Sequence, residues 1–200
     1  MKNIDEKQFI DKVIVALRKT AINLEKFQVK TALGKAEAKD TFEEIKKKFN
    51  LYIHDSEYKV KKVKENIDDL KAKFEELLVQ LELGKAETIQ VFKKQKKQLL
   101  LTLHEIESKI KSNDTLKRMY AITLIEIEQF KIQLEILEEK YKSDKKKAIS
   151  SFQKGKDEFN SFIDKITAKY SKKKEETKLE HFQNEISEAF NHFKNAFSNS

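Results

Sequence analysis

The chain has 200 residues, of which 38% are hydrophobic and 38% charged, with no proline, no cysteine and only three glycines. Because proline and glycine interrupt helices, this composition favours long helices and excludes folds that depend on many tight turns. The lack of cysteine excludes disulfides and thiolate chemistry, and the net charge of +8 comes mainly from lysine. Lysine favours diffuse, salt-sensitive attraction to polyanions over base-specific contacts.

The first residues of the chain predict its location. Met1–Glu6 turns acidic where a signal peptide needs an apolar core. The longest early apolar run, Val13–Leu17, is far shorter than the ~20 residues that span a bilayer. We therefore expect a cytoplasmic protein.

An internal repeat with a spacing of 50 residues occupies the first half of the chain. Leu33–Glu37 recurs unchanged as Leu83–Glu87. The other residues that recur fifty positions later are Glu25, Val29, Phe42, Lys46, Lys47, Leu51, His54, Glu57 and Lys59. So many matches without a gap indicate a duplication, with copies at about 17–62 and 67–112. We expect a duplicated region at 1–111 and return helices at 112–200, together forming one structural unit.

Apolar residues of this region recur at intervals of three and four, which predicts helix over about 5–111. The row consists of Phe42, Ile45, Phe49, Tyr52, Val60, Val63, Ile67, Leu70, Phe74, Leu77, Leu81, Phe92, Leu99, Leu103, Ile106 and Ile110. A turn at His54–Ser56 is an alternative to an unbroken helix. Gly34 and Gly84 lie in this pattern and predict a bend or a close helix contact. His54 and His104 are equivalent positions, so we expect them to share a packing role.

The clearest predicted turn is Ser112–Thr115, where Asp114 or Thr115 can cap the helix that follows. Weaker candidates for a break are Ser143–Asp144 and Ser171. The helix after 115 carries two apolar rows on opposite sides, so it needs partners on both. The rows are Ile127, Phe130, Leu134, Leu137 and Tyr141, and Ile122, Ile125, Ile132 and Ile136. The predicted fold is all-α, with long amphipathic helices in an antiparallel coiled coil or an elongated helical bundle.

No pattern in the sequence points to catalysis, a cofactor or a small-molecule substrate. His181, Glu185, Glu188 and His192 share a helix face, which invites a metal site. The Glu-x-x-His pairs of di-iron bundles are missing, so a solvated polar face is the better interpretation.

Lysine clusters beside phenylalanines suggest possible contacts with nucleic acid, polyphosphate or another anionic surface. They contain Lys46, Lys47, Lys48, Lys93, Lys94, Lys96, Lys97, Lys145, Lys146 and Lys147. Each nearby phenylalanine falls on the apolar row, so core packing explains it better than stacking on bases does.

The C-terminal helix carries one continuous apolar face that predicts docking of helix on helix. The residues expected to dock are Phe182, Ile186, Phe190, Phe193 and Phe197. Few lysines flank this face, which favours contact with protein, from this chain or another copy, over a membrane surface.

Two segments resemble a family of small bacterial coiled-coil proteins described as stress-response proteins. The likeness lies in Phe9–Tyr52, through Lys35–Lys39 followed by Phe42 and Ile45, and in Ile186–Phe197. Members are about half this length and have Trp where this chain has Phe. The resemblance implies a class of helical protein, without an established biochemical activity.

We therefore expect a non-catalytic protein that acts by self-association or scaffolding, in contact with itself or another helical protein, with a role in stress response. The alternatives are non-specific polyanion binding through lysine-rich helix faces and binding at a membrane surface.

Overall fold

A computed structural model describes the backbone of residues 2–31, 35–60, 68–142, 145–171 and 179–198. Side chains are described for 8–31, 38–56, 68–141, 150, 152–170 and 184–195. The described residues form an all-α helical structure without strands, as the sequence predicts. Its helices are α1 (Lys2–Thr31), α2 (Lys35–Val60), α3 (Asp68–Leu81), α4 (Ile89–Lys111), α5 (Asp114–Met119), α6 (Ala121–Lys142), α7 (Lys145–Ser171) and α8 (Leu179–Ser198). None of these described helices is both long and apolar enough to cross a membrane.

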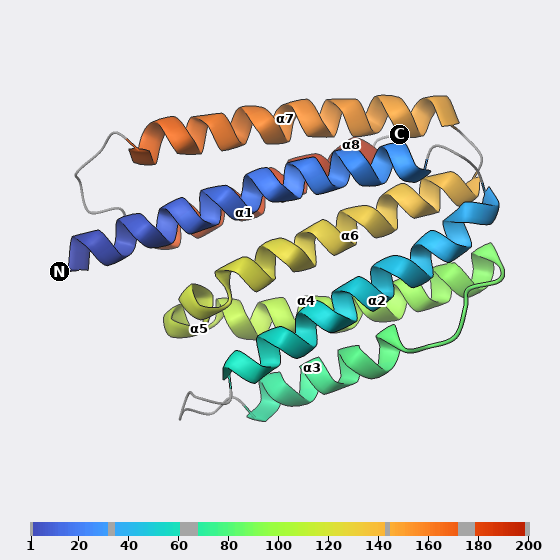
Figure 1. Cartoon of the computed structure of the whole chain (residues 1–200), viewed down its shortest axis with the longest axis horizontal. Coiled ribbons are helices and arrows are strands. Elements are labelled where there is room, and N and C mark those ends of the chain that lie inside the picture. The colour runs from blue at the N-terminus through green and yellow to red at the C-terminus, as the bar shows by residue number, and fades with distance from the viewer. Residues whose placement is uncertain (1, 32–34, 61–67, 143–144, 172–178, 199–200) are drawn as a thin grey trace. The chain divides into compact units, whose positions relative to one another are not determined.

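The helices, labelled and coloured by residue number in Figure 1, belong to two compact units. Unit 1 contains residues 1–32 and 144–200, and unit 2 contains residues 33–143. These bounds differ from the division at residue 111 suggested by the repeat, because α6 packs against both α2 and α4.

Unit 2 is a bundle in which α3 and α6 each contact both α2 and α4. The helices α2 and α4 therefore occupy opposite corners of this bundle and belong to the two copies of the repeat. Their equivalent residues Phe42 and Phe92 meet edge to face, with ring centroids 4.9 Å apart. Phe49 stacks on Phe130 of α6 at 4.3 Å. These fully or almost fully buried rings form the centre of unit 2.

The alternative of a turn at His54–Ser56 is not realised, because α2 continues through these residues. The described chain leaves the helical path instead at 82–88, between α3 and α4. Gly84 lies in this interruption rather than within a helix. The close helix contact expected there is absent, since no described atom lies within 4 Å of the position of an added Cβ. Gly34 and the candidate break at Ser143–Asp144 lie outside the described residues.

Local capping explains where the helices of unit 2 begin. The Thr88 hydroxyl accepts a hydrogen bond from the Val91 N–H at 3.2 Å and caps α4. The predicted turn at 112–115 is present, but Asn113 rather than Asp114 or Thr115 caps α5. Its side-chain oxygen accepts a bond from the Leu116 N–H at 3.1 Å. The asparagine satisfies an otherwise unpaired donor in the first turn of the helix.

Both apolar rows of α6 are largely buried, as predicted for a helix with partners on two sides. Ile127, Phe130, Leu134 and Leu137 are at most 1% exposed, and Ile125, Ile132 and Ile136 at most 2%. Ile122 and Tyr141 at the ends of the two rows are partly exposed.

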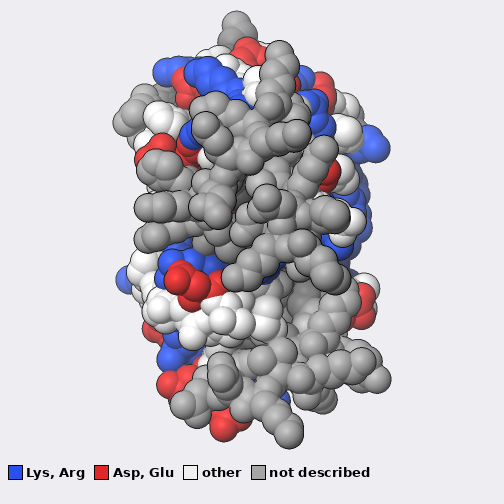
Figure 2. All heavy atoms as spheres, turned by 90° about the vertical axis from the view of Figure 1, so that its left-hand side faces the viewer, with Lys and Arg blue, Asp and Glu red and all other residues white. Residues whose placement is uncertain are grey.

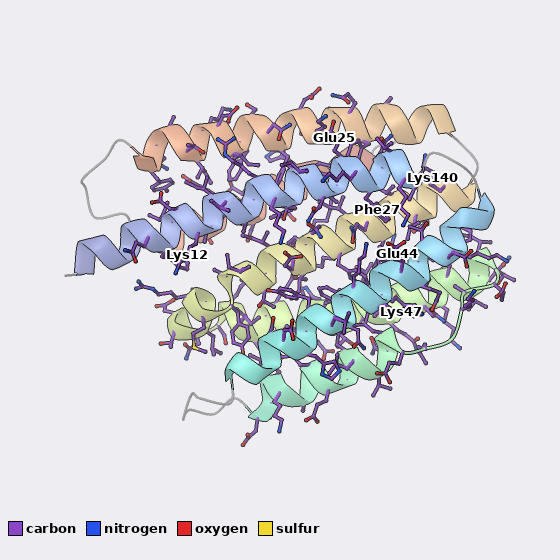
Figure 3. The ribbon with its side chains drawn as sticks, viewed as in Figure 1. Lys12, Glu25, Phe27, Glu44, Lys47 and Lys140 are labelled. Atoms are coloured by element: carbon purple, nitrogen blue, oxygen red, sulfur yellow. The ribbon has the colours of Figure 1, made fainter. Side chains whose placement is uncertain are left out.

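Unit 1 is formed by α1, α7 and α8, with α7 in contact with both of the others. Arg18 of α1 lies 3.4 Å from a carboxylate oxygen of Asp164 on α7. Glu25 extends from α1 towards α7 (Figure 3), where it accepts a bond from Lys156 at 2.6 Å. At Gly155 of α7, an added Cβ would lie 3.2 Å from the Phe193 ring, so the missing side chain lets α8 approach closely.

Replacing Phe190 with Ala should destabilise unit 1, because this ring is 0% exposed and lies 4.8 Å from the Phe159 ring. We expect a loss of about 3–5 kcal/mol of unfolding free energy. Chemical denaturation followed by circular dichroism measures it, with Val79→Ala on the exposed side of α3 as the control. An unchanged unfolding curve for Phe190→Ala would contradict this packing.

Candidate functional site

The C-terminal residues expected to dock lie against another helix of the same unit where their side chains are described. Phe190 and Phe193 are at most 1% exposed. Both rings pack on Phe159 of α7, and Phe193 also contacts Phe152 at 5.7 Å. Ile186 is partly exposed, and the side chains of Phe182 and Phe197 lie outside the described residues. Because α7 covers Phe190 and Phe193, these two residues are not available as a docking surface for other molecules.

The lysines proposed as polyanion contacts fall into three groups. Lys47, Lys48, Lys93, Lys94 and Lys97 are exposed. Lys46 and Lys96 are buried, at 0% and 7% exposure, so the structure corrects the expectation that they contact polyanions. The side chains of Lys145, Lys146 and Lys147 lie outside the described residues. On the face shown in Figure 2, the described basic and acidic side chains lie among one another rather than forming one basic field.

Lys46 holds the connection between α3 and α4 in place. Its ammonium group donates to the Leu83 carbonyl at 2.6 Å and lies 2.9 Å from Glu43. It also lies over the Phe42 ring, 4.8 Å from the centroid. Gln95 of α4 donates to the neighbouring carbonyl of Gly84 at 2.8 Å. These side chains satisfy carbonyls that have no helical partner, which explains why residues 82–88 hold a defined path.

Buried ion pairs join α4 to α6. The equivalent of Lys46 in the second repeat, Lys96, lies 2.7 Å from Glu135 and 2.5 Å from Glu138. Further along, Lys131 of α6 donates to both carboxylate oxygens of Glu107, at 2.7 and 2.6 Å. Burial of ionised groups is costly, so each of these lysines needs its acidic partners.

Glu107 is an acid of this seam whose pKa departs from its ordinary value. Burial raises the pKa of Glu107 above its ordinary value, and the nearby charge of Glu128 raises it further, while Lys131 acts in the opposite direction. Lys131 lies between the two acids, 3.4 Å from Glu128. The positive charge of Lys131 therefore offsets the repulsion between the buried carboxylates of Glu107 and Glu128.

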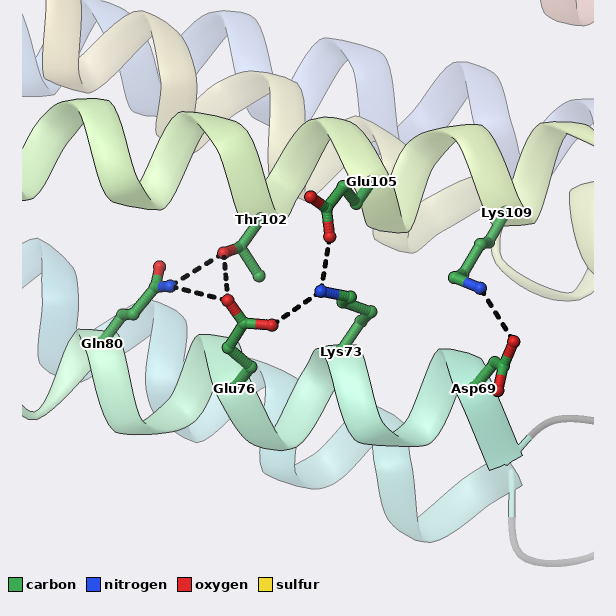
Figure 4. Close-up of polar contacts among 7 residues, drawn as sticks. All are labelled: Asp69, Lys73, Glu76, Gln80, Thr102, Glu105 and Lys109. Carbon is green, nitrogen blue, oxygen red and sulfur yellow. Dashed lines mark hydrogen bonds and ion pairs between the residues drawn. The ribbon is translucent and has the colours of Figure 1, made fainter.

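A polar network on the surface joins α3 to α4 (Figure 4). Lys73 bonds Glu76 at 2.8 Å and pairs with Glu105 at 2.5 Å. These hydrogen bonds raise the pKa of Lys73 and lower the pKa of Glu76. Glu76 also accepts a hydrogen bond from the Thr102 hydroxyl, which itself accepts one from Gln80. Each of these side chains makes at least one contact between α3 and α4, which fits a structural role.

The possible metal-binding face of α8 is not assembled among the described side chains. Glu185 accepts hydrogen bonds from Lys169 and from the Tyr170 hydroxyl of α7. Glu188 and His192 are exposed, and the His181 side chain lies outside the described residues. Within the described part of the chain, no cluster of three or more suitable His, Asp or Glu side chains is present.

The two repeat-related histidines do not have the expected packing role, because His54 and His104 are both exposed. They form part of a matched surface pattern. On α2, Lys47, Leu51 and His54 are all exposed, and on α4 so are their equivalents Lys97, Leu101 and His104. We call these sets the Lys–Leu–His stripes. The recurrence of lysine, leucine and histidine at positions i, i+4 and i+7 of both repeat copies can be recognised in the sequence.

The α4 stripe borders a shallow groove with a volume of about 340 Å³. The groove is lined by Lys93, Lys96, Lys97, Leu100, Leu101 and Glu138. Leu101 is 55% exposed, whereas the Lys96 ammonium is occupied by Glu135 and Glu138. The groove therefore combines exposed leucine with exposed lysine, a surface suited to an amphipathic partner.

A second exposed apolar surface lies on α1, among the residues that the structure describes. Val15, Ile22 and Val29 are 65%, 52% and 63% exposed. They are spaced by seven residues and so lie along one side of the helix. Leu24, on the buried side, is two residues beyond Ile22, or about 200° around the helix. The described helix is thus apolar both towards its own unit and towards solvent.

Comparisons with known proteins gave no match: no family model, curated protein or solved structure corresponds to this chain. The resemblance of Phe9–Tyr52 and Ile186–Phe197 to stress-response coiled-coil proteins therefore stays a prediction.

Replacing Lys131 with Met should leave Glu107 and Glu128 buried without their shared cation. We expect a loss of about 3–5 kcal/mol at about pH 7, measured by urea unfolding. The folded-state pKa of Glu107 is already raised, and this change should raise it further. The free energy of unfolding then falls as the pH rises from the unfolded-state pKa of Glu107 to its higher folded-state pKa. Acidification to about pH 5 should therefore recover part of the lost stability.

The matched control is Lys71→Met, which removes a lysine that is 50% exposed and pairs with Glu75 on one helix. It should leave stability nearly unchanged at both pH values. A Lys131→Met variant that resembles this control would contradict the structural role of the buried pair.

Proposed function

We propose that this chain is a non-catalytic helical protein that acts by self-association or scaffolding. The observation that carries the proposal is the exposed row of Val15, Ile22 and Val29 on α1. Apolar residues repeated every seven positions are typical of one half of a coiled-coil seam. A second copy of α1, or a helix of another protein, would remove these side chains from water.

The way α1 is held supports its use as a docking helix. Leu17 and Leu24 are at most 1% exposed on the buried side of α1. Arg18 and Glu25 tie the helix to α7 through Asp164 and Lys156. The exposed row is therefore presented by an anchored helix, which reduces the ordering cost of association.

The use of ionisable groups also supports a structural rather than a catalytic protein. Lys46, Lys96 and Lys131 are buried, and each is bonded to a carboxylate or carbonyl within unit 2. Catalytic sites direct buried charged groups towards a substrate, whereas these lysines hold elements of unit 2 together. The proposal includes a cytoplasmic location, which the cysteine-free composition favours, and a role in stress response, which the family resemblance favours.

Replacing Ile22 with Ser should weaken self-association, because it places a hydroxyl in the centre of the apolar row. Light scattering combined with X-ray scattering would give mass and shape for the parent and the variant. We expect the parent to exceed the mass of one chain and Ile22→Ser to dissociate at concentrations where the parent does not.

The control is Val79→Ser, which changes a valine of similar exposure, 66%, on α3 of unit 2. It should retain the mass of the parent. A parent chain that remains monomeric at high concentration would contradict self-association through α1, and equal dissociation of both variants would contradict the assignment to this row.

Polyanion binding is a second candidate, favoured by the exposed Lys93, Lys94 and Lys97 on α4. No ion pair within the described part of unit 2 engages these three lysines. Retention on heparin at about 50 mM salt that disappears at about 200 mM is the expected behaviour of such a surface. Lack of retention at the lower salt concentration would remove this candidate.

A further inference from the structure

The duplication allows the surfaces of two equivalent helices, α2 and α4, to be compared within one chain. Their buried centres agree, since a phenylalanine and a lysine are retained at the same two positions in both copies. Three positions that are at least partly exposed differ instead. They are Glu43, Glu44 and Asn50 in α2, and Lys93, Lys94 and Leu100 in α4. The two helices therefore share a core but have different outer surfaces.

On α2, acidic side chains offset the nearby lysines. Glu43 lies 2.9 Å from Lys46, and Glu44 accepts a hydrogen bond from Lys48 at 2.7 Å. Asn50 occupies the position at which α4 has a leucine. The surface of α2 is therefore mixed in charge and has one apolar residue fewer than its counterpart.

On α4, positive charge is left for a partner. Lys93, Lys94 and Lys97 are exposed, and none of them has an ion pair among the described residues. Lys93 and Lys97 are one helical turn apart, and both line the groove on this helix. Leu100 and Leu101 belong to the same lining. The groove thus combines unpaired ammonium groups with apolar side chains.

An acidic amphipathic helix matches this surface in both charge and polarity. Leucines along one side of such a helix would cover Leu100 and Leu101, and flanking glutamates would pair with the exposed lysines. The acid of the groove, Glu138, does not oppose this arrangement, because it lies 2.5 Å from Lys96, which offsets its charge. The acidic side chains of a partner would therefore meet an excess of positive charge.

Other occupants fit the groove less well. A nucleic acid would pair with the lysines but leave Leu101, which is 55% exposed, without an apolar partner. A symmetric contact between two copies of the chain would place Lys97 of one copy near the same lysine of the other. The net charge of +8 adds general repulsion between copies. An acidic helix is the occupant that uses both the lysines and the leucines.

We propose that the α4 groove is a docking site for one acidic amphipathic helix of a partner protein, and that the equivalent surface of α2 does not bind such a helix. This inference rests on the proposed function, since it gives the partner class for scaffolding. It does not involve the exposed row on α1, which carries the proposal of self-association.

The test uses the full chain and a synthetic helical peptide of about 18 residues, with leucines on one face and glutamates on both flanks. A twin peptide carries lysine in place of each glutamate. Titration calorimetry should show one acidic peptide bound per chain, with an affinity at least about tenfold above that of the twin. Lys93→Glu with Lys94→Glu gives α4 the acids that α2 has at these positions, and it should lower the affinity at least about tenfold. Leu101→Ser should also weaken binding, because it removes apolar contact area.

The matched control is Lys47→Glu with Lys165→Glu, which makes the same total charge change at exposed lysines of α2 and α7. It should bind one peptide with the affinity of the parent chain. The control separates pairing in the groove from the effect of net charge. Circular dichroism of each variant confirms that the helices remain folded.

Equal binding of the two peptides, two acidic peptides per chain, or equal affinities of the α4 variant and its control would overturn the inference. Binding of a single-stranded DNA oligonucleotide without binding of the peptide would also overturn it, in favour of a polyanion surface. Failure of the peptide while the parent still self-associates through Ile22 would overturn only this inference. Failure of both measurements would overturn the proposed function as well.

Discussion

An ammonium group buried in a helical bundle must find oxygen partners, and this requirement shapes unit 2. Lys46 is fully buried beside the Phe42 ring. It reaches the Leu83 carbonyl in the connection between α3 and α4. The irregular connection therefore provides what a continuous helix could not: a carbonyl oxygen that is not already occupied by an N–H group. The place where the chain leaves the helical path and the burial of a lysine on α2 depend on one another.

The repeated segment Lys-Ala-Glu has a different conformation in each copy of the repeat, because only the second copy lies in this connection. Residues 35–37 lie in helix α2, whereas the identical Lys85–Glu87 lies outside any helix. Local propensity cannot distinguish two identical segments, so contacts with the rest of unit 2 decide. Lys85 pairs with Asp40 and Glu87 with Lys39, which joins this connection to the first turns of α2. The duplicated halves have diverged in conformation while retaining the buried phenylalanine and lysine.

The sequence predicted what depends on periodicity and missed what depends on tertiary contacts. Helix content, the turn after Lys111 and the two buried rows of α6 followed from spacing and capping chemistry. The burial of Lys46 and Lys96 was detectable, because each lies four residues after a phenylalanine on the apolar row. Their charge led to the wrong expectation of exposed contacts, since the acids of α6 and the Leu83 carbonyl are remote in sequence. The spacing of the outer row of α1 and of the stripes is visible in the sequence, but their exposure could not be predicted, because a spacing pattern does not show which side of a helix a bundle covers.

Unit 1 brings together the beginning and the end of the chain, with all of unit 2 inserted between α1 and α7. Arg18 and Asp164, which meet across α1 and α7, are separated by 146 residues. During synthesis on the ribosome, α1 must therefore wait until α7 has emerged, whereas the helices of unit 2 can already assemble. Contacts between residues so far apart in the sequence slow folding, which makes the assembly of unit 1 the expected late step in the maturation of this protein. Until then the side of α1 that packs on α7 is exposed, which makes a newly made chain prone to aggregation at this stage.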